Sequence, residues 1–313
     1  MVKNMHQTDL PLISVGLAFY NVEKTIANAV KSVLMQTYHN FEFIIIDDGS
    51  TDHSFDVVQD LAKTDGRIKL VRGEKNMGVG PRLNQITDLA RGEYIVRMDA
   101  DDMMLPERIE KQMEVLLSDK NLDLIDCAAY IINELGEPVG KRKNNDISDL
   151  TLRKVLKSRT VFFHPTIIAK TAWFKKNRYN DDYKRGPDFE LWCRTFGNTN
   201  YSRIEEPLFL YREGKVSIRN YEISAVSFRR TLHTYANGHL SSFELNKEIA
   251  FSHLRTFLYR FFGFFGLQHL LTATRNETVS KKEKEKISGV IGQIEAFVFQ
   301  QTAPEQKIVN NSV

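Results

Sequence analysis

Apolar runs alternate with helical patterns through the first half of the 313-residue chain, and this alternation constrains the fold more than any other feature. Residues 12–19 (LISVGLAF), 41–46 (FEFIII) and 94–98 (YIVRM) are rich in β-branched and aromatic side chains, which is typical of buried strands. Each run is followed by a segment with apolar residues at helical spacing. Strands joined by crossover helices form parallel, doubly wound sheets. We therefore predict an α/β fold of the Rossmann-like kind, with helices on both faces of a mostly parallel sheet.

Polar side chains follow three of these strands, at the point where each strand ends. In doubly wound sheets, ligands bind beyond the carboxyl ends of the strands, close to the place where the strand order reverses. The three groups are Tyr20-Asn21-Glu23, Asp47-Asp48 and Asp99-Asp101-Asp102. We therefore predict a ligand site at this edge of the sheet.

Three carboxylates crowd into four residues directly after the strand at 94–98. Each like-charged pair at ~4 Å costs roughly 4 kcal/mol at an effective dielectric constant near 20. Acids in such a loop are often simply solvated, and the residues alone leave that alternative open. At a ligand edge, however, Asp99 and Asp101 would share one hard cation, because Mg²⁺ and Mn²⁺ take one or two carboxylates together with ligand phosphates. An EF-hand fits poorly, because Met104 stands where its glycine belongs.

Asp48 and Tyr20 each allow two interpretations. Asp48 would be unremarkable in a plain strand-to-helix turn, whereas at a ligand edge it would accept hydrogen bonds from a nucleobase or ribose. Tyr20 would be a core tyrosine, or it would stack on the same base.

Composition excludes several classes of protein. A net charge of +3 gives no global argument for a nucleic-acid partner. The two cysteines, Cys127 and Cys193, lie far apart, which excludes a disulfide scaffold and a cysteine-rich zinc site and suits a reducing compartment. The chain shows neither a secretion signal nor a run of ~18 apolar residues. We therefore expect a cytoplasmic location, at the inner face of the cell membrane if the C-terminal segment binds lipid.

The pattern becomes helical beyond Arg212, and we divide the chain there. The predicted α/β domain covers residues 1–215, in two halves at about 10–120 and about 121–215, and a helical segment covers 216–313. In that segment Arg255 and Arg260 interleave with phenylalanines. Core helices of a small bundle look like this, and so does a helix lying in a membrane interface. A bundle, a membrane contact and a dimer all stay open, as does the oligomeric state.

Four motifs in register resemble the large bacterial family of inverting nucleotide-sugar glycosyltransferases with a GT-A fold, glycosyltransferase family 2. They are LISVGLAFYN, FIIIDDGSTD, KNMGVGPRLNQ and GEYIVRMDADDMMLPERI. The resemblance extends from Leu12 to about Arg212. It implies a GT-A fold whose first half (about 10–120) binds the nucleotide donor and whose second half (about 121–215) binds the acceptor. It also implies a nucleotide-sugar donor in which uridine is the expected nucleoside, and Mn²⁺ or Mg²⁺ as the cofactor.

The resemblance also implies roles on the donor side. Tyr20 and Asp48 would hold the nucleoside, and Arg82 would reach the diphosphate or the sugar. Asp99 would meet the ribose or the metal, Asp101 would coordinate the metal, and Asp102 would lie near the donor sugar. The remaining predicted donor-binding residues are Ala18, Asn21, Glu23 and Ala100. Ala18-Phe19 stands where many relatives have proline with a hydroxyl residue, so one nucleoside contact would come from the backbone.

On the acceptor side, Asp188 in GPDFELW stands where the family has its general base. A carboxylate at the start of a helix is also a common N-terminal charge. Pro187 replaces the acidic residue that often precedes the base. Residues 161–169 (VFFHPTIIA) are predicted to be extended, which places His164 on a strand before the base. His164 and Arg212 are further predicted contacts to the acceptor or the diphosphate, although a lone histidine is more often structural.

The predicted reaction is therefore inverting sugar transfer to a hydroxyl of a glycan or lipid-linked acceptor, in the synthesis of a bacterial surface polysaccharide. A metal-dependent nucleotidyltransferase is one alternative, but it should show a glycine-rich basic phosphate loop, and residues 12–23 have none. A receiver-like phospho-switch is another, but it would need only roughly 100–150 residues and would leave the acceptor-side elements without a purpose.

Overall fold

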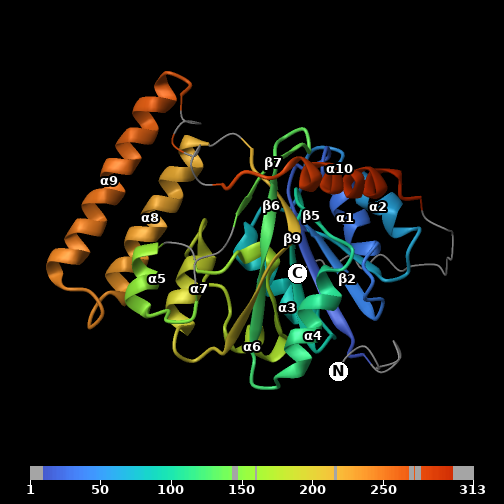
Figure 1. Cartoon of the computed structure of the whole chain (residues 1–313), viewed down its shortest axis with the longest axis horizontal. Coiled ribbons are helices and arrows are strands. Elements are labelled where there is room, and N and C mark those ends of the chain that lie inside the picture. Colours follow the sequence, from blue (N-terminus) through green and yellow to red (C-terminus); the bar gives the residue numbers. More distant parts are fainter. Residues whose placement is uncertain are drawn as a thin grey trace.

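A computed structural model describes residues 10–142, 147–158, 161–214, 217–267, 271 and 276–298. One curled sheet runs through the molecule with helices on both of its faces (Figure 1). Its strands are β1 (Ile13–Phe19), β2 (Phe41–Asp47), β3 (Ile68–Arg72), β4 (Tyr94–Asp99), β5 (Met103–Met104), β6 (Leu124–Ile132), β7 (Pro138–Arg142), β8 (Ile168–Lys170) and β9 (Tyr201–Arg212). The helices are α1 (Ile26–Leu34), α2 (Ser54–Ala62), α3 (Val79–Leu89), α4 (Arg108–Ser118), α5 (Leu152–Ser158), α6 (Thr171–Lys176), α7 (Pro187–Thr195), α8 (Ile218–Tyr235), α9 (Ser242–Phe264) and α10 (Lys281–Ala296).

The strand order is β3-β2-β1-β4-β8-β6-β9-β5, and β7 pairs with β6. The four strands of the first half are parallel, with β1 between β2 and β4. The chain runs outward from β1 through β2 to β3 and then returns to place β4 on the other side of β1, so the strand order reverses at β1. The predicted doubly wound α/β sheet is confirmed.

Each face of the sheet has its own apolar core. Successive side chains of a strand point to opposite faces, so Phe43 and Ile45 of β2 pack under α1 and α2, whereas Ile44 and Ile46 pack against α3. All seven residues of β2 are therefore buried. Two-sided burial explains why its sequence is a continuous apolar run rather than an alternating one.

The segment Val161–Ala169, which we predicted to be extended, is not one strand. His164–Thr166 form a 3₁₀ turn, and pairing with the sheet begins only at Ile168. Pro165 has no backbone N–H to give to a strand, and the Thr166 hydroxyl is bonded to the carbonyls of Phe163 and Cys127. The prediction that His164 lies on a strand is therefore wrong.

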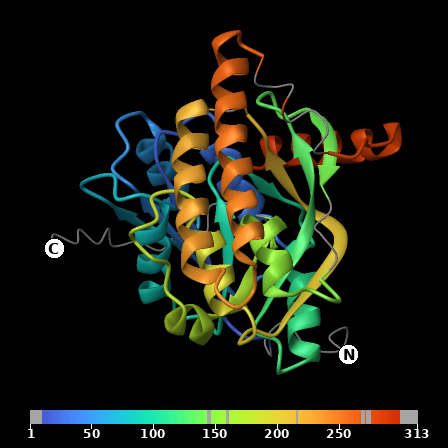
Figure 2. The same ribbon diagram turned by 90° about the vertical axis from the view of Figure 1, so that its left-hand side faces the viewer.

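The C-terminal helices share cores with the sheet. Phe228 and Leu232 of α8 join the core that contains Phe189 of α7. On the opposite side of the molecule, isoleucines of α10 pack against Met103 and Leu210, and α9 lies outside α8 (Figures 1 and 2). The predicted domain boundary at 215/216 lies outside the described residues, and the division into two domains stays a prediction. Within the described part of the chain, no helix is both long enough and apolar enough to cross a membrane.

Candidate active site

A cavity of about 520 Å³ opens at the carboxyl ends of β1, β2 and β4, which is a usual size for a small-molecule site. Nine of the residues predicted from sequence line it. These are Ala18, Tyr20, Asp48, Arg82, Asp99, Ala100, Asp101, His164 and Asp188. The structure thus brings together the ends of strands that lie up to 80 residues apart with the start of α7, as the topology of the sheet predicts.

Asp48 organises one wall of this cavity. Its buried carboxylate accepts hydrogen bonds from the backbone N–H groups of Met77 (2.8 Å) and Gly78 (2.9 Å) and from Nε of Arg82 (2.7 Å). The Arg82 guanidinium also donates to Gln85 and to the carbonyl of Lys75. Arg82 therefore positions the loop at 75–78, and the donor contact that we predicted for it stays a prediction.

Gly49 makes this arrangement sterically feasible. Its φ is +78°, and a Cβ atom built on it would lie 2.9–3.2 Å from backbone atoms of Lys75 and Asn76. Only glycine adopts this conformation and this close approach without strain. The loop can therefore pack onto the Asp48 turn.

Two predicted donor residues lie beside the cavity rather than in it. The Asn21 side-chain oxygen accepts from Thr51 N (2.8 Å), and Glu23 accepts from His53 N (3.1 Å). Both side chains link the end of β1 to the loop that starts α2. Tyr20, in contrast, lines the cavity and is 43% exposed, as a ring that stacks on a bound base would be.

The acids after β4 have different surroundings. Asp99 accepts from Arg97 at 2.8 Å, and Asp101 is exposed toward the cavity. Although it reaches solvent, the surrounding protein desolvates the Asp101 carboxyl, and together with the charge of Asp99 this raises its pKa to about 6. These two residues therefore form an acid pair whose negative charge is not fully compensated.

Asp102 is fully buried and does not line the cavity. One of its oxygens accepts from the backbone N–H of Arg212 (2.7 Å), and the other has no partner among the described residues. Arg212 donates to the carbonyls of Asp101, Asn133 and Glu134. Both residues therefore brace the acidic loop against β9, and their predicted contacts to sugar and phosphate stay predictions.

Asp188 is the second residue of α7 and faces the acids across the cavity. Burial raises the pKa of its carboxyl above the ordinary value, and the nearby Arg97 guanidinium opposes part of this shift. His164 forms a 2.8 Å hydrogen bond with the Tyr179 hydroxyl, and burial followed by the charge of Arg97 holds the pKa of the imidazole well below its usual range. The imidazolium form of His164 is therefore disfavoured, which makes this neutral ring a poor proton acceptor and leaves the Asp188 carboxylate as the candidate base.

Sequence reasoning missed several residues of this site. Arg97 lies buried beneath the cavity and its charge acts on both Asp99 and Asp188. An arginine inside the otherwise apolar strand YIVRM was the available signal, because a buried charge is retained only where it is paired. Lys184 and Arg185 also line the cavity, but in the sequence they look like ordinary surface cations.

Comparison with known proteins agrees with this arrangement. A model of glycosyl transferase family 2 matches residues 14–179, which is more than half of the chain. An uncharacterised glycosyltransferase of Methanocaldococcus jannaschii is 32% identical over 209 residues, which cover 66% of this chain and 72% of that protein. The O-antigen biosynthesis glycosyltransferase WbnJ of Escherichia coli is 30% identical over 234 residues, which cover 71% of this chain and 90% of WbnJ.

Solved structures share the fold at lower identity. TarS of S. aureus, in complex with UDP-GlcNAc, superposes with a TM-score of 0.55 at 20% identity over 90% of this chain and 80% of its own. The mannosyltransferase PcManGT of Pyrobaculum calidifontis, in complex with GDP-Man and Mn²⁺, superposes with a TM-score of 0.55 at 16% identity. The superposition covers 92% of this chain and 82% of PcManGT. Both likenesses confirm the GT-A fold. The chain belongs to glycosyl transferase family 2 and is a glycosyltransferase.

Proposed function

We propose that the enzyme transfers a sugar, with inversion and with Mn²⁺ or Mg²⁺, from a UDP-sugar to a hydroxyl of a glycan or lipid-linked acceptor in polysaccharide synthesis. The observation that carries this proposal is that the acid pair Asp99 and Asp101 and the carboxylate of Asp188 line one cavity. The nucleotide-sugar complexes of TarS and PcManGT and the role named for WbnJ support it. Family membership leaves the nucleotidyltransferase and receiver-like alternatives without support.

On the donor side, the nucleoside would lie between the Tyr20 ring and the loop that Asp48 holds. Lys184 and Arg185 line the same cavity, and their cationic groups would form charge-assisted hydrogen bonds with the diphosphate. The donor sugar would then point toward Asp188.

The acid pair fits a divalent ion whose coordination is completed by donor phosphates. Among the described residues, no group of three or more His, Cys, Asp or Glu side chains could hold a metal ion. Mg²⁺ and Mn²⁺ sites at phosphates need only one or two carboxylates, and a cation would offset the repulsion that raises the pKa of Asp101. Asp101, with Asp99, would hold the ion, which when bound stabilises negative charge on the leaving diphosphate.

Asp188 would act as general base. Its carboxylate takes the proton of the acceptor hydroxyl while that oxygen forms a bond to the anomeric carbon. The bond from the same carbon to the diphosphate breaks on the opposite face, and its electron pair leaves with the diphosphate. One displacement inverts the anomeric centre, so no protein nucleophile is needed.

A panel of nucleotide sugars tests the donor and metal assignments together. We expect slow release of UDP from one UDP-sugar when the full chain is incubated with Mn²⁺, because donor hydrolysis needs no acceptor. Chelation with EDTA should reduce this rate at least tenfold. Equal rates with and without EDTA would contradict the metal assignment, and a preference for GDP- or ADP-sugars would contradict the uridine assignment.

We further propose that the outer face of α9 contacts a membrane that carries anionic lipid. This face presents large apolar side chains that are 45–86% exposed, namely Phe243, Phe251, Leu254, Phe257, Phe261, Phe264 and Phe265. They recur at helical spacing on the face of α9 opposite Ser252 and Tyr259, the two residues that contact Arg229 and Tyr221 of α8. Exposed cations border them, including Lys247 and Arg255. Apolar side chains with cationic borders match an anionic lipid surface.

The cations beside this face also argue against a dimer in which a second copy of the chain packs on it. A two-fold contact centred on Leu254 would place the two Arg255 side chains close together, which costs free energy. The chemistry of the α9 outer face therefore favours lipid.

Vesicle flotation checks this proposal. The protein should float with vesicles that contain phosphatidylglycerol, and replacing Phe257, Phe261 and Phe264 by serine should weaken binding at least tenfold, since each buried phenylalanine contributes roughly 1.5–3 kcal/mol. Replacing exposed Leu135, on the β6–β7 turn, by serine serves as the matched control. Unchanged flotation of the triple variant, or a wild-type dimer that the variant dissociates, would contradict membrane docking.

A further inference from the structure

A second cavity, of about 220 Å³, lies on the other side of Asp188. Its walls come from the start of α7, with Gly186, Asp188 and Phe189, and from α8, with Tyr221, Ala225 and Phe228. Gly186 and Asp188 also line the donor cavity. The start of α7, with Gly186 and Asp188, therefore borders both cavities.

The walls of this second cavity are mostly apolar and aromatic. The rings of Phe189 and Phe228 are buried, and their centroids lie 5.4 Å apart. The Tyr221 ring is held by stacking on Tyr259 at 3.8 Å. Within the part of the chain that the structure describes, no lysine or arginine lines this cavity. The surface is therefore suited to an uncharged group rather than to a phosphate.

One polar atom of the wall residues has no partner. The Tyr221 hydroxyl oxygen is buried and makes no hydrogen bond among the described residues. Buried hydroxyls are normally bonded, and leaving one without a partner is unfavourable. This oxygen has less than 1 Å² of accessible surface, so Tyr221 lines the cavity with its ring and not with its hydroxyl group.

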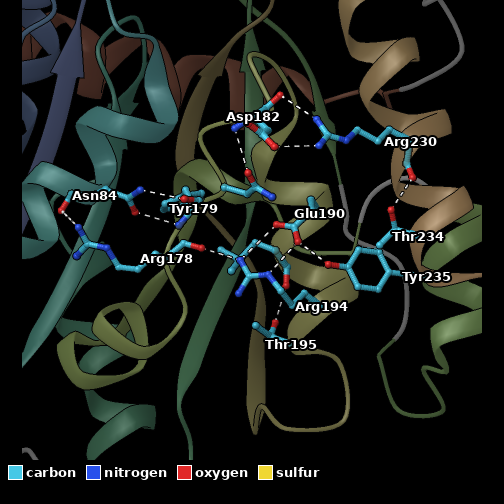
Figure 3. Close-up of polar contacts among 12 residues, drawn as sticks. Asn84, Arg178, Tyr179, Asp182, Glu190, Arg194, Thr195, Arg230, Thr234 and Tyr235 are labelled. Carbon is cyan, nitrogen blue, oxygen red and sulfur yellow. Dashed lines mark hydrogen bonds and ion pairs between the residues drawn. The ribbon is translucent and has the colours of Figure 1, made fainter.

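Polar contacts attach α8 to α7 and to the loop that precedes α7 (Figure 3). Arg230 binds Asp182 at 2.9 Å, and the Tyr235 hydroxyl donates to the buried Glu190 of α7 at 2.6 Å. On the other side of α7, Tyr179 N donates to Asn84 of α3 at 2.9 Å. These contacts fix the positions of α3 and α8 relative to α7, which carries Asp188.

We propose that the cavity between α7 and α8 is the acceptor subsite and that it takes an uncharged sugar unit carrying the nucleophilic hydroxyl. This inference rests on the proposed function, since it needs Asp188 to be the base. The volume corresponds to about seven water molecules at roughly 30 Å³ each, the size of one sugar ring. The apolar face of the sugar ring packs against Phe189 and Phe228, and one of its hydroxyls meets Asp188.

The inference makes α8 a specificity element, although the helix lies outside the segment that matches the family model. A chain with a different α8 would keep the donor chemistry and change the acceptor. An anionic polyol-phosphate acceptor would fit poorly, because its phosphate would meet aromatic rings and no lysine or arginine among the described residues lines this cavity.

The test measures UDP release from the donor with and without 4-nitrophenyl glycosides of neutral sugars. At least one glycoside should accelerate release, and oligomeric glycerol phosphate should not. Ala225→Trp fills the cavity and should lower the ratio of transfer to donor hydrolysis at least tenfold. Ser224→Phe, at another lining position, should do the same if Ala225→Trp does not fold. Val226→Trp, on the exposed side of the same helix, is the matched control and should leave that ratio within twofold.

The outcomes separate the two proposals. Folded Ala225→Trp and Ser224→Phe proteins with a wild-type ratio would overturn the subsite. Acceleration by glycerol phosphate alone, or by no neutral glycoside, would overturn the class of acceptor. Failure of the wild type to hydrolyse any nucleotide sugar would instead overturn the proposed function.

Discussion

Replacing Asp188 by asparagine will reduce sugar transfer about 10²–10⁴-fold, the usual contribution of a positioned general base. Asparagine keeps the shape of the side chain at the start of α7 but cannot accept the proton of the acceptor hydroxyl. The donor contacts come from other elements, so the affinity for UDP with Mn²⁺ should change less than threefold, as isothermal titration calorimetry would measure.

The pH dependence distinguishes a base from a merely structural carboxylate. Burial raises the pKa of Asp188, and only the deprotonated form accepts a proton. With saturating Mn²⁺ and donor, which keep Asp101 deprotonated, the wild-type rate should therefore rise with pH through this raised pKa, and the residual rate of Asp188→Asn should lack that rise. Asp60→Asn, an exposed acid on α2, is the matched control. Near-normal turnover by Asp188→Asn would show that the base lies elsewhere.

Replacing Asp101 by asparagine will have two opposite effects. Donor binding in Mn²⁺ should weaken at least 100-fold, because a principal carboxylate ligand is lost. The protein without metal should become more stable, because the repulsion between Asp101 and Asp99 that raises the pKa of Asp101 disappears. Active sites commonly store such unfavourable charge.

The sign of the stability effect follows from proton linkage. The folded-state pKa of Asp101 is about 6, above its ordinary value of 3.8, so the folded state binds more protons than the unfolded state between these values. This carboxyl therefore lowers the free energy of unfolding of the wild type as pH rises from about 4 to about 6. The decrease is complete above pH 6. After allowance for solvent screening of an exposed group, we expect a gain of about 1 kcal/mol for Asp101→Asn at pH 7.5.

Thermal unfolding in EDTA measures this gain, which corresponds to about 2–4 °C. At pH 4 the wild-type carboxyl is already protonated, so the difference between the two proteins should vanish there, which serves as an internal control. Adding UDP with Mn²⁺ should raise the midpoint of the wild type and leave that of the variant unchanged. A variant that is less stable than the wild type at pH 7.5 in EDTA would mean that Asp101 has a structural role.

Residues close to the ends of strands were predictable. Tyr20, Asp48, Asp99 and Asp101 follow strands whose apolar runs are visible in the sequence, and all four line the donor cavity. Parallel strands joined by crossovers all end at the same edge of the sheet, so the order of the motifs along the chain was enough to predict their convergence.

Residues whose surroundings depend on distant segments were not predictable. The protein partners of the Arg82 guanidinium, namely Asp48, Gln85 and the carbonyl of Lys75, could not be predicted from the sequence, and its donor contact stays a prediction. His164 was predicted on a strand and lies in a 3₁₀ turn. A side chain uses whichever partners the fold brings close, and a single sequence does not record them.

The sequence by itself therefore determined the sheet, the edge at which ligands bind and the acids that gather there, because hydrophobic periodicity and strand order act along the chain. Only the tertiary structure decided that Arg97 underlies both Asp99 and Asp188 and that α8, which begins 30 residues after Asp188, closes a second cavity against it. Burial, pKa and cavity walls arise from atoms that meet through space. Such contacts are set by the packing of whole elements rather than by the order of residues within one.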